Sequence, residues 1–239
     1  MLSIIIPTLN EEKIIGKTLE GLKPLTLPHQ IIVSDGGSTD HTVEIAKEKS
    51  VAVTAFSGPR RQNIAQGRNA GAKLAEGEFL VFLDADCFIP DPDTFFNAAF
   101  ARFKQDPNLV AINANVRVFP DMATLGDRLV FGAINLGLRL TNNIFNRGEA
   151  LGEFQMMKKD AFLRLGGFSE HLITREDADM FRRLSGIGRV LMPPELTVFH
   201  TGRRAHTVGW SRMIFMWAVN TFFVNFFKRA YSKEWKVIR

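Results

Sequence analysis

The sequence contains a single cysteine, Cys87, among 239 residues. A disulfide within the chain is therefore excluded, which is typical of a protein from a reducing compartment. The first seven residues lead directly into a predicted strand, without a basic segment and a long apolar run, so we expect no signal peptide. Neither repeats nor low-complexity segments are present. These absences favour a cytoplasmic globular protein.

Tyrosine and tryptophan are also scarce, and all four such residues lie after residue 209. The same end of the chain is basic. From His200 onward there are eight Lys or Arg against one acid, a net charge of +7, which leaves −2 for residues 1–199 and +5 for the whole chain. Basic residues among interfacial aromatics favour anionic lipid or a pyrophosphate over nucleic acid as the partner.

The segment 213–227 is apolar apart from two Asn and one Thr. As a helix its 15 residues would reach only about 22 Å, short of the roughly 30 Å hydrocarbon core, so a full span is not expected. Two interpretations stay open. The helix lies at the inner face of the membrane as a peripheral contact, or it packs on the domain or on a second copy in a homodimer.

Strand and helix patterns alternate through the first half of the chain. Buried strands are predicted at 2–7, 30–34, 51–56 and 79–83, and helices at 14–22, 43–49 and 62–74. This alternation predicts an α/β fold, a single Rossmann-like domain with a central, mostly parallel sheet. Downstream we predict strands at 110–119 and 153–158, helices at 94–103, 160–165 and 175–184, and a core helix or pair of helices within 125–145. An acceptor-binding or lipid-touching role for the segment 125–145 stays open.

Asp84 and Asp86 follow the most apolar predicted strand, 79–83. In an open α/β sheet ligands bind beyond the carboxyl ends of the strands, so both carboxylates should face the functional crevice. Carboxylate oxygens suit Mg²⁺ or Mn²⁺ shared with a substrate diphosphate. Asp35 ends another strand, where it can accept hydrogen bonds from a base or a ribose; a plain turn with Ser38 or Asp40 capping the next helix is the alternative.

Six motifs together resemble the family 2 glycosyltransferases of the GT-A fold, over about residues 1–205 and in the family's order. They are Pro7-Thr8-Leu9-Asn10-Glu11, Asp35-Gly36-Gly37-Ser38-Thr39-Asp40, Gly67-Arg68-Asn69-Ala70-Gly71, Asp84-Ala85-Asp86, Gly166-Gly167-Phe168 and Glu176-Asp177. The resemblance implies a GT-A domain at 1–205, with a nucleotide-binding half (1–118) and an acceptor half (119–205). An amphipathic helical tail would follow at 206–239.

The resemblance also implies residue roles. Pro7, Thr8 and Glu11 would line the nucleoside, Asp35 would read the base, and Arg68 would lie near the base and the Asp84-Ala85-Asp86 loop. Asp84 would face the ribose and Asp86 would bind the metal. Asp177, paired with Glu176, would be the general base, although an acid pair at a helix start is an ordinary alternative. His200 would bind the metal, with Arg203 or Arg204 on the phosphates. A structural role for His200 is an equally favoured alternative. His206 is a weaker candidate for a metal ligand.

Two positions depart from the family pattern. His41 stands where many members have glycine, and His206-Thr207-Val208-Gly209-Trp210 does not supply the Gln-x-x-Arg-Trp signature of processive members. We therefore expect an inverting, metal-dependent, single-addition transferase that uses a nucleotide-diphosphate sugar, UDP favoured and GDP open. The acceptor would be a hydroxyl or phosphate group, with a lipid-linked one left open. The alternatives are a sugar nucleotidyltransferase and a non-catalytic, membrane-associated scaffold.

Overall fold

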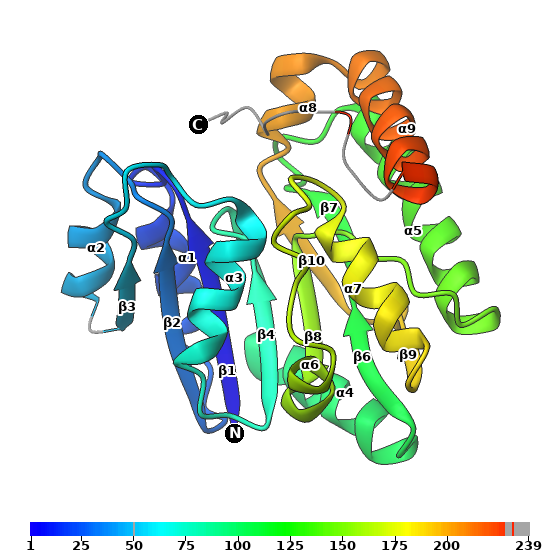
Figure 1. Cartoon of the computed structure of the whole chain (residues 1–239), viewed down its shortest axis with the longest axis horizontal. Helices are drawn as coiled ribbons and strands as arrows, with labels where there is room; N and C mark the ends of the chain where they lie inside the picture. The colour runs from blue at the N-terminus through cyan, green and yellow to red at the C-terminus, as the bar shows by residue number, and fades with distance from the viewer. Residues whose placement is uncertain (50, 228–230, 232–239) are drawn as a thin grey trace.

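The computed structural model of the chain describes residues 1–49, 51–227 and 231. A seven-stranded sheet with the order β3-β2-β1-β4-β8-β6-β9 forms its centre (Figure 1). The strands are β1 (Leu2–Thr8), β2 (His29–Asp35), β3 (Ala52–Ala55), β4 (Phe79–Leu83), β6 (Leu109–Asn113), β8 (Phe154–Lys158) and β9 (Arg189–Leu191). Only the pairings of β8 are antiparallel, so the mostly parallel sheet predicted from the sequence is confirmed.

Helices cover both faces of this sheet. One face carries α1 (Ile15–Leu22), α2 (Thr42–Glu48) and α4 (Pro92–Gln105), and the other carries α3 (Ile64–Lys73), α6 (Lys159–Arg164) and α7 (Glu176–Ser185). Successive strand residues serve opposite faces: Ile4 and Ile6 join the first core and Ile5 the second. Because both faces are covered, β1 and β4 are continuous apolar runs, which explains why they were predicted correctly.

The predicted strand 110–119 is wrong as a single element. It is divided into β6 and β7 (Asn115–Val118), and β7 belongs to a second sheet with the order β5-β10-β7. The amide group of Asn113 donates to the carbonyls of Leu151 and Phe154, and that of Asn115 donates to those of Pro193 and Leu196. These polar side chains bind the backbone of other segments, and the chain changes sheets between them.

The predicted helix or pair of helices within 125–145 is confirmed, but its placement in the core is wrong. The segment forms α5 (Leu125–Arg139), continued by a π-helical turn, η1 (Leu140–Ile144), at the edge of the molecule. Its inner side holds Phe131 and Asn135, whose amide group bonds both the N–H and the carbonyl of Val116 in β7. Its outer side exposes several leucines. The helix is therefore apolar on two sides, and only one of these sides is buried.

The C-terminal part described by the structure consists of α8 (Arg203–Val208) and α9 (Trp210–Phe227). The predicted boundary at residue 205 falls inside α8. Met213 and Val224 of α9 are buried, so this helix packs on the domain. Among the described residues, no helix is long and apolar enough to cross a membrane. The basic residues predicted to meet lipid headgroups (Lys228, Arg229, Lys233 and Lys236) lie outside the described residues.

Gly71 of α3 allows this helix to pack closely on the sheet. A Cβ atom added at Gly71 would lie 2.4 Å from Cγ2 of Ile5 and 3.1 Å from Cβ of Ser34. We expect Gly71→Ala to lower the free energy of unfolding in urea by about 1–2 kcal/mol, because the overpacking exceeds the gain in helix propensity. In the matched variant Gly132→Ala, the added Cβ on α5 meets nothing within 4 Å. That variant should gain about 0.5–1 kcal/mol; equal changes in both would contradict the packing account.

Candidate functional site

A cavity of about 660 Å³ lies beyond the carboxyl ends of β1, β2 and β4. It is closed on the other side by α8, α9, α5 and the start of α7, at the upper side of the molecule in Figure 1. All the residues predicted for the site line this cavity except Asp35: Pro7, Thr8, Glu11, Arg68, Asp84, Ala85, Asp86, Glu176, Asp177, His200, Arg203 and Arg204. Segments separated by almost 200 residues therefore meet here.

A short second sheet brings His200 beside the Asp84-Ala85-Asp86 loop. β10 (Thr197–His200) pairs antiparallel with the two-residue strand β5 (Cys87–Phe88), and His200 is opposite Cys87. The loop between β4 and β5 is therefore fixed at both ends. Oδ2 of Asp86 accepts a 2.7 Å hydrogen bond from the Thr201 hydroxyl. β5 was not predicted, because two residues show no periodicity.

Arg203 links this loop to the first strand. Its two terminal nitrogens donate to the two carboxylate oxygens of Glu11, both at 2.7 Å. Its Nε lies 3.2 Å from Oδ2 of Asp86. A bidentate guanidinium with a carboxylate on either side is a fixed positive charge at the cavity wall. Arg204 also lines the cavity.

His200 and Asp86 are the residues that could hold a divalent cation. Burial lowers the pKa of His200, which favours the neutral imidazole that binds metals, and its Nε2 is buried without a hydrogen-bond partner. Within residues 1–49, 51–227 and 231, no group of three or more His, Cys, Asp or Glu side chains is placed to hold a metal. Two protein ligands nevertheless suit a cation whose other ligands are diphosphate oxygens and water.

Arg68 is the centre of the buried charge in the cavity. Only 1% of its side chain is exposed. It donates to Oε1 of Glu176 at 2.8 Å, to Oδ1 of Asp84 at 3.1 Å and to the carbonyl of Gly152 at 2.9 Å. The guanidinium also lies over the Phe168 ring, 5.3 Å from its centre. One side chain from α3 therefore joins the end of β4 to the start of α7.

The carboxyl groups around Arg68 have raised pKa values. Burial raises the pKa of Asp84 to about 6, although the Arg68 charge opposes the shift and Asp86 adds to it. Burial also raises the pKa values of Glu176 and Asp177, a pair in close contact at the first turn of α7, and the Asp177 charge raises that of Glu176 further. Arg175, before this pair, has φ of 63° and donates to Glu149 at 2.7 Å. This left-handed residue sets the direction of entry into α7.

Glu153 belongs to the site but was not predicted from the sequence. It lines the cavity just before β8, and its carbonyl accepts the N–H of Asp84 at 3.1 Å. Burial, with the nearby charge of Asp84, raises its pKa to about 8. A single glutamate before a strand has no sequence signal of its own. Only the insertion of β8 beside β4 reveals it.

Asp35 is the one predicted site residue that does not line the cavity. Its Oδ1 accepts the N–H groups of Gly37 and Ser38, and its Oδ2 accepts the hydroxyl groups of Thr8 and Ser38. A carboxylate offers about four acceptor positions, and these four donors use them. Its neighbours Ser34 and Gly36 do line the cavity. Asp35 therefore organises this loop, and its role with a base stays a prediction.

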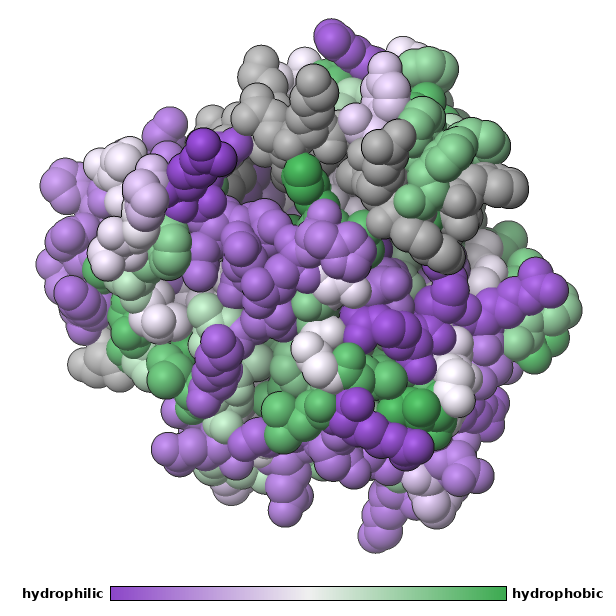
Figure 2. All heavy atoms as spheres, viewed as in Figure 1, coloured by the Kyte–Doolittle hydropathy of each residue, from purple (hydrophilic) through white to green (hydrophobic). Residues whose placement is uncertain are grey.

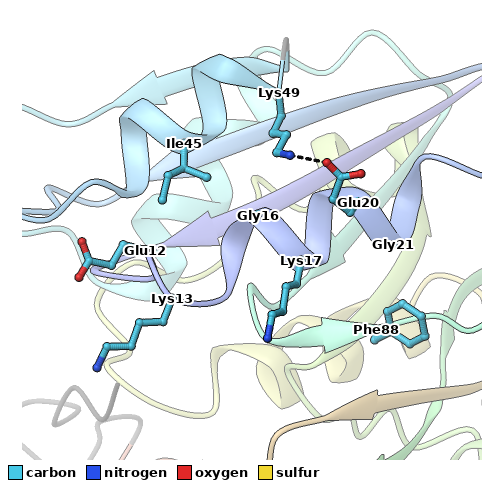
Figure 3. Close-up of a pocket in the computed structure, with 9 residues that line it drawn as sticks. All are labelled: Glu12, Lys13, Gly16, Lys17, Glu20, Gly21, Ile45, Lys49 and Phe88. Carbon is cyan, nitrogen blue, oxygen red and sulfur yellow. Dashed lines mark hydrogen bonds and ion pairs between the residues drawn. The ribbon is translucent and has the colours of Figure 1, made fainter.

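A second hollow, of about 640 Å³, lies over α1 between α2 and β5 (Figure 3). Figure 3 shows Lys13, Lys17 and Lys49 at its edge, and Lys49 is paired with Glu20. Lys13, Lys17 and Glu20 are exposed, as is usual for a solvated helix face. Arg68 and Glu176 in the cavity at the strand ends are, by contrast, buried and paired.

Comparison with known families agrees with this placement of the site. The family described as "Glycosyl transferase family 2" matches residues 3–165. The chain belongs to glycosyl transferase family 2. This match covers β1, β2, β4, the Asp84-Ala85-Asp86 loop and the segment that contains Glu153.

The curated relatives of this family 2 member are longer than the chain. An "Uncharacterized glycosyltransferase" of Haemophilus influenzae is 30% identical over 77% of this chain and 62% of its own length. The succinoglycan biosynthesis protein ExoA of Rhizobium meliloti is 27% identical over 84% of this chain and 63% of its own length. The chain therefore spans about three fifths of the length of these relatives.

Solved structures confirm the GT-A fold. The mannosyltransferase PcManGT of Pyrobaculum calidifontis, in complex with GDP-Man and Mn²⁺, matches with a TM-score of 0.68 and 23% identity, over 84% of this chain and 56% of that one. Glucosyl-3-phosphoglycerate synthase of Mycobacterium tuberculosis, with Mn²⁺, UDP and glucosyl-3-phosphoglycerate, matches with a TM-score of 0.61 and 21% identity, over 92% and 78%.

The raised pKa of Glu153 has a measurable consequence. Because it is about 8 in the folded chain against an ordinary 4.5, the folded chain binds more protons than the unfolded chain between these values. Stability should therefore fall as pH rises through this window. We expect Glu153→Gln to raise the free energy of unfolding in urea on the order of 1–3 kcal/mol at pH 8 and to change it little at pH 5.

The control for this experiment is Glu44→Gln, on the exposed side of α2. Its free energy of unfolding should differ little from that of the unmodified chain, and by the same amount at both pH values. If Glu153→Gln behaves in the same way as Glu44→Gln, Glu153 is not the proton-binding group described.

Proposed function

We propose that this chain is an inverting, metal-dependent transferase that adds one sugar from a nucleotide-diphosphate sugar to a hydroxyl or phosphate acceptor. One observation carries the proposal: Asp84 and Asp86 at the end of β4 line one cavity with the Glu176-Asp177 pair and with His200, whose Nε2 has no hydrogen-bond partner. Membership of family 2 supports the assignment of this arrangement to a donor site with a general base. Solved GT-A structures with GDP-Man or UDP beside Mn²⁺ support the donor class.

Asp177 is the proposed general base. It would take the proton from the acceptor hydroxyl while the acceptor oxygen bonds to the anomeric carbon. The bond from that carbon to the diphosphate breaks, and its electron pair leaves with the diphosphate. A carboxylate with a raised pKa holds a proton better than an ordinary aspartate, which suits this role. A single displacement of this kind inverts the anomeric centre.

Asp86 and His200 would hold Mn²⁺ or Mg²⁺, which when bound neutralises charge on the leaving diphosphate. Arg203, tied to Glu11 and Asp86, offers a fixed guanidinium at the same wall. Arg68 does not need to touch the substrate, because it is fully buried and positions Asp84 and Glu176. The base could be uracil or guanine; UDP is favoured, as the sequence suggested.

The acceptor side of the cavity has an apolar wall. It is formed by Phe131, Ile134 and Leu138 of α5 with Met213 and Trp217 of α9. This wall favours an acceptor with a lipid or another apolar part, presented beside Asp177. Since 206–210 lacks the processive signature, we propose one addition per binding event.

Calorimetric titration of UDP and GDP, each with and without Mn²⁺, tests this function. We expect metal-dependent binding of one nucleotide. Asp86→Asn should weaken that binding on the order of tenfold or more, because the cation loses its carboxylate ligand. Asp121→Asn, an exposed aspartate outside the cavity, is the matched control and should bind as the unmodified chain does. No binding of either nucleotide with any metal would remove the transferase proposal and leave the scaffold alternative.

A further inference from the structure

The outer side of α5 and η1 exposes a continuous row of large apolar side chains. We call it the leucine face; it consists of Leu125, Leu129, Leu136, Leu140, Ile144 and Phe145, each between 44% and 73% exposed. Spacings of four and seven residues place five of them on one side of a helix. Contiguous apolar surface on a soluble protein usually marks an interaction site.

The exposed charges of α5 and η1 have one sign, because Asp127, the one acid of this stretch, is buried. Residues 128–148 contain three arginines and no acid. Arg128 and Arg147 are exposed, and the Arg147 guanidinium lies over the Phe145 ring, 5.8 Å from its centre. Cationic groups are therefore set directly beside the apolar side chains. A partner that contacts this face must accept apolar groups and supply negative charge.

α9 also has apolar side chains at the surface. It contains one arginine and no acid, and it exposes Ile214 and Phe215. Hydrophobic spheres lie over α9 and over the far end of α5–η1 in Figure 2. The side chain of Trp210 contacts the Phe131 ring of α5, with ring centres 5.3 Å apart. Both helices thus belong to one edge of the molecule.

Asp127 fixes α8 and α9 to α5. Its buried carboxylate accepts from Trp210 Nε1 at 2.9 Å, contacts His206 Nε2 at 2.8 Å and caps its own helix through Thr124. Burial opposes ionisation of Asp127, but the hydrogen bonds from His206 and Thr124 lower its pKa to about 2. His206, a weaker metal candidate in the sequence, therefore has a structural role. α8 and α9 are therefore held against α5.

We propose that the leucine face docks on an anionic lipid bilayer. The apolar side chains would enter the boundary between headgroups and acyl chains, and Arg128 and Arg147 would meet lipid phosphates. A second copy of the chain is a poorer occupant. In a two-fold interface the same face meets itself, so arginines would face arginines with no carboxylate between 128 and 148 to pair with them.

This docking places the acceptor wall next to the bilayer. Phe131, Ile134 and Leu138, which line the cavity, are on the same helix as the leucine face. An acceptor anchored in the leaflet that the leucine face contacts could reach the cavity along α5. Delivery of a membrane-anchored acceptor to the cavity rests on the proposed function, whereas docking of the leucine face does not. The vesicle experiment and the nucleotide titration can therefore fail independently.

Co-sedimentation with vesicles tests the proposal. The purified chain is mixed with vesicles of phosphatidylcholine alone or of phosphatidylcholine with phosphatidylglycerol. We expect binding to the anionic vesicles that weakens as salt is raised. Leu129→Asp with Leu136→Asp should weaken binding on the order of tenfold for each leucine, because both side chains would leave water on docking. Both are more than half exposed, so folding should be unaffected.

The matched control is Leu163→Asp, an equally exposed leucine (61%) on α6, away from α5 and α9. It should bind the vesicles as the unmodified chain does, and all variants should show the same melting temperature. Two results would overturn the proposal directly: no binding of the unmodified chain to anionic vesicles, or a loss of vesicle binding in Leu163→Asp as large as in the double variant. A third result would also overturn it: the unmodified chain does not bind vesicles but forms a dimer in solution, and the double variant is a monomer. The last would assign the face to a second copy.

Discussion

The buried guanidinium of Arg68 is the interaction on which the site depends. It comes from α3 and makes its contacts with the end of β4, with the loop before β8 and with the first residue of α7. Without this positive charge, Asp84, Glu176 and Asp177 would be an uncompensated group of carboxylates in a cavity shielded from water. The donor side and the base side of the site are therefore held together by one residue.

The same group of charges explains why several pKa values are raised together. Burial of the cavity floor disfavours each carboxylate anion, and one guanidinium cannot compensate for four acids that include Glu153. A group of carboxyl groups with raised pKa values is suited to bind cations. A divalent cation and the arginines at the wall would complete the balance when a diphosphate binds. The electrostatics of the site therefore agree with the proposed chemistry.

The sequence predicts the fold and most of the cavity because these depend on local patterns. The strands β1, β2 and β4 are apolar runs that end in polar loops, and parallel neighbours bring these loops together. What the sequence does not predict depends on contacts between distant segments. β5 is too short to show a pattern, Asn113 and Asn115 divide one predicted strand by binding other backbones, and Glu153 is found only through the pairing of β8 with β4. The exposed side of the segment 125–145 could not be assigned for a different reason: an apolar run does not tell which of its sides is covered, so a lipid-touching role was only left open.

The central claim, that Arg68 holds the two sides of the site together by charge, is tested most directly by a double-mutant cycle on unfolding free energy at pH 8. Arg68→Met should lower the free energy of unfolding by about 3–5 kcal/mol, because it leaves buried carboxylates unpaired. Adding Glu176→Gln should recover a large part of this loss, because one of those charges is removed. If the effects of the two single substitutions simply add, Arg68 acts by packing alone and the electrostatic account of the site is wrong.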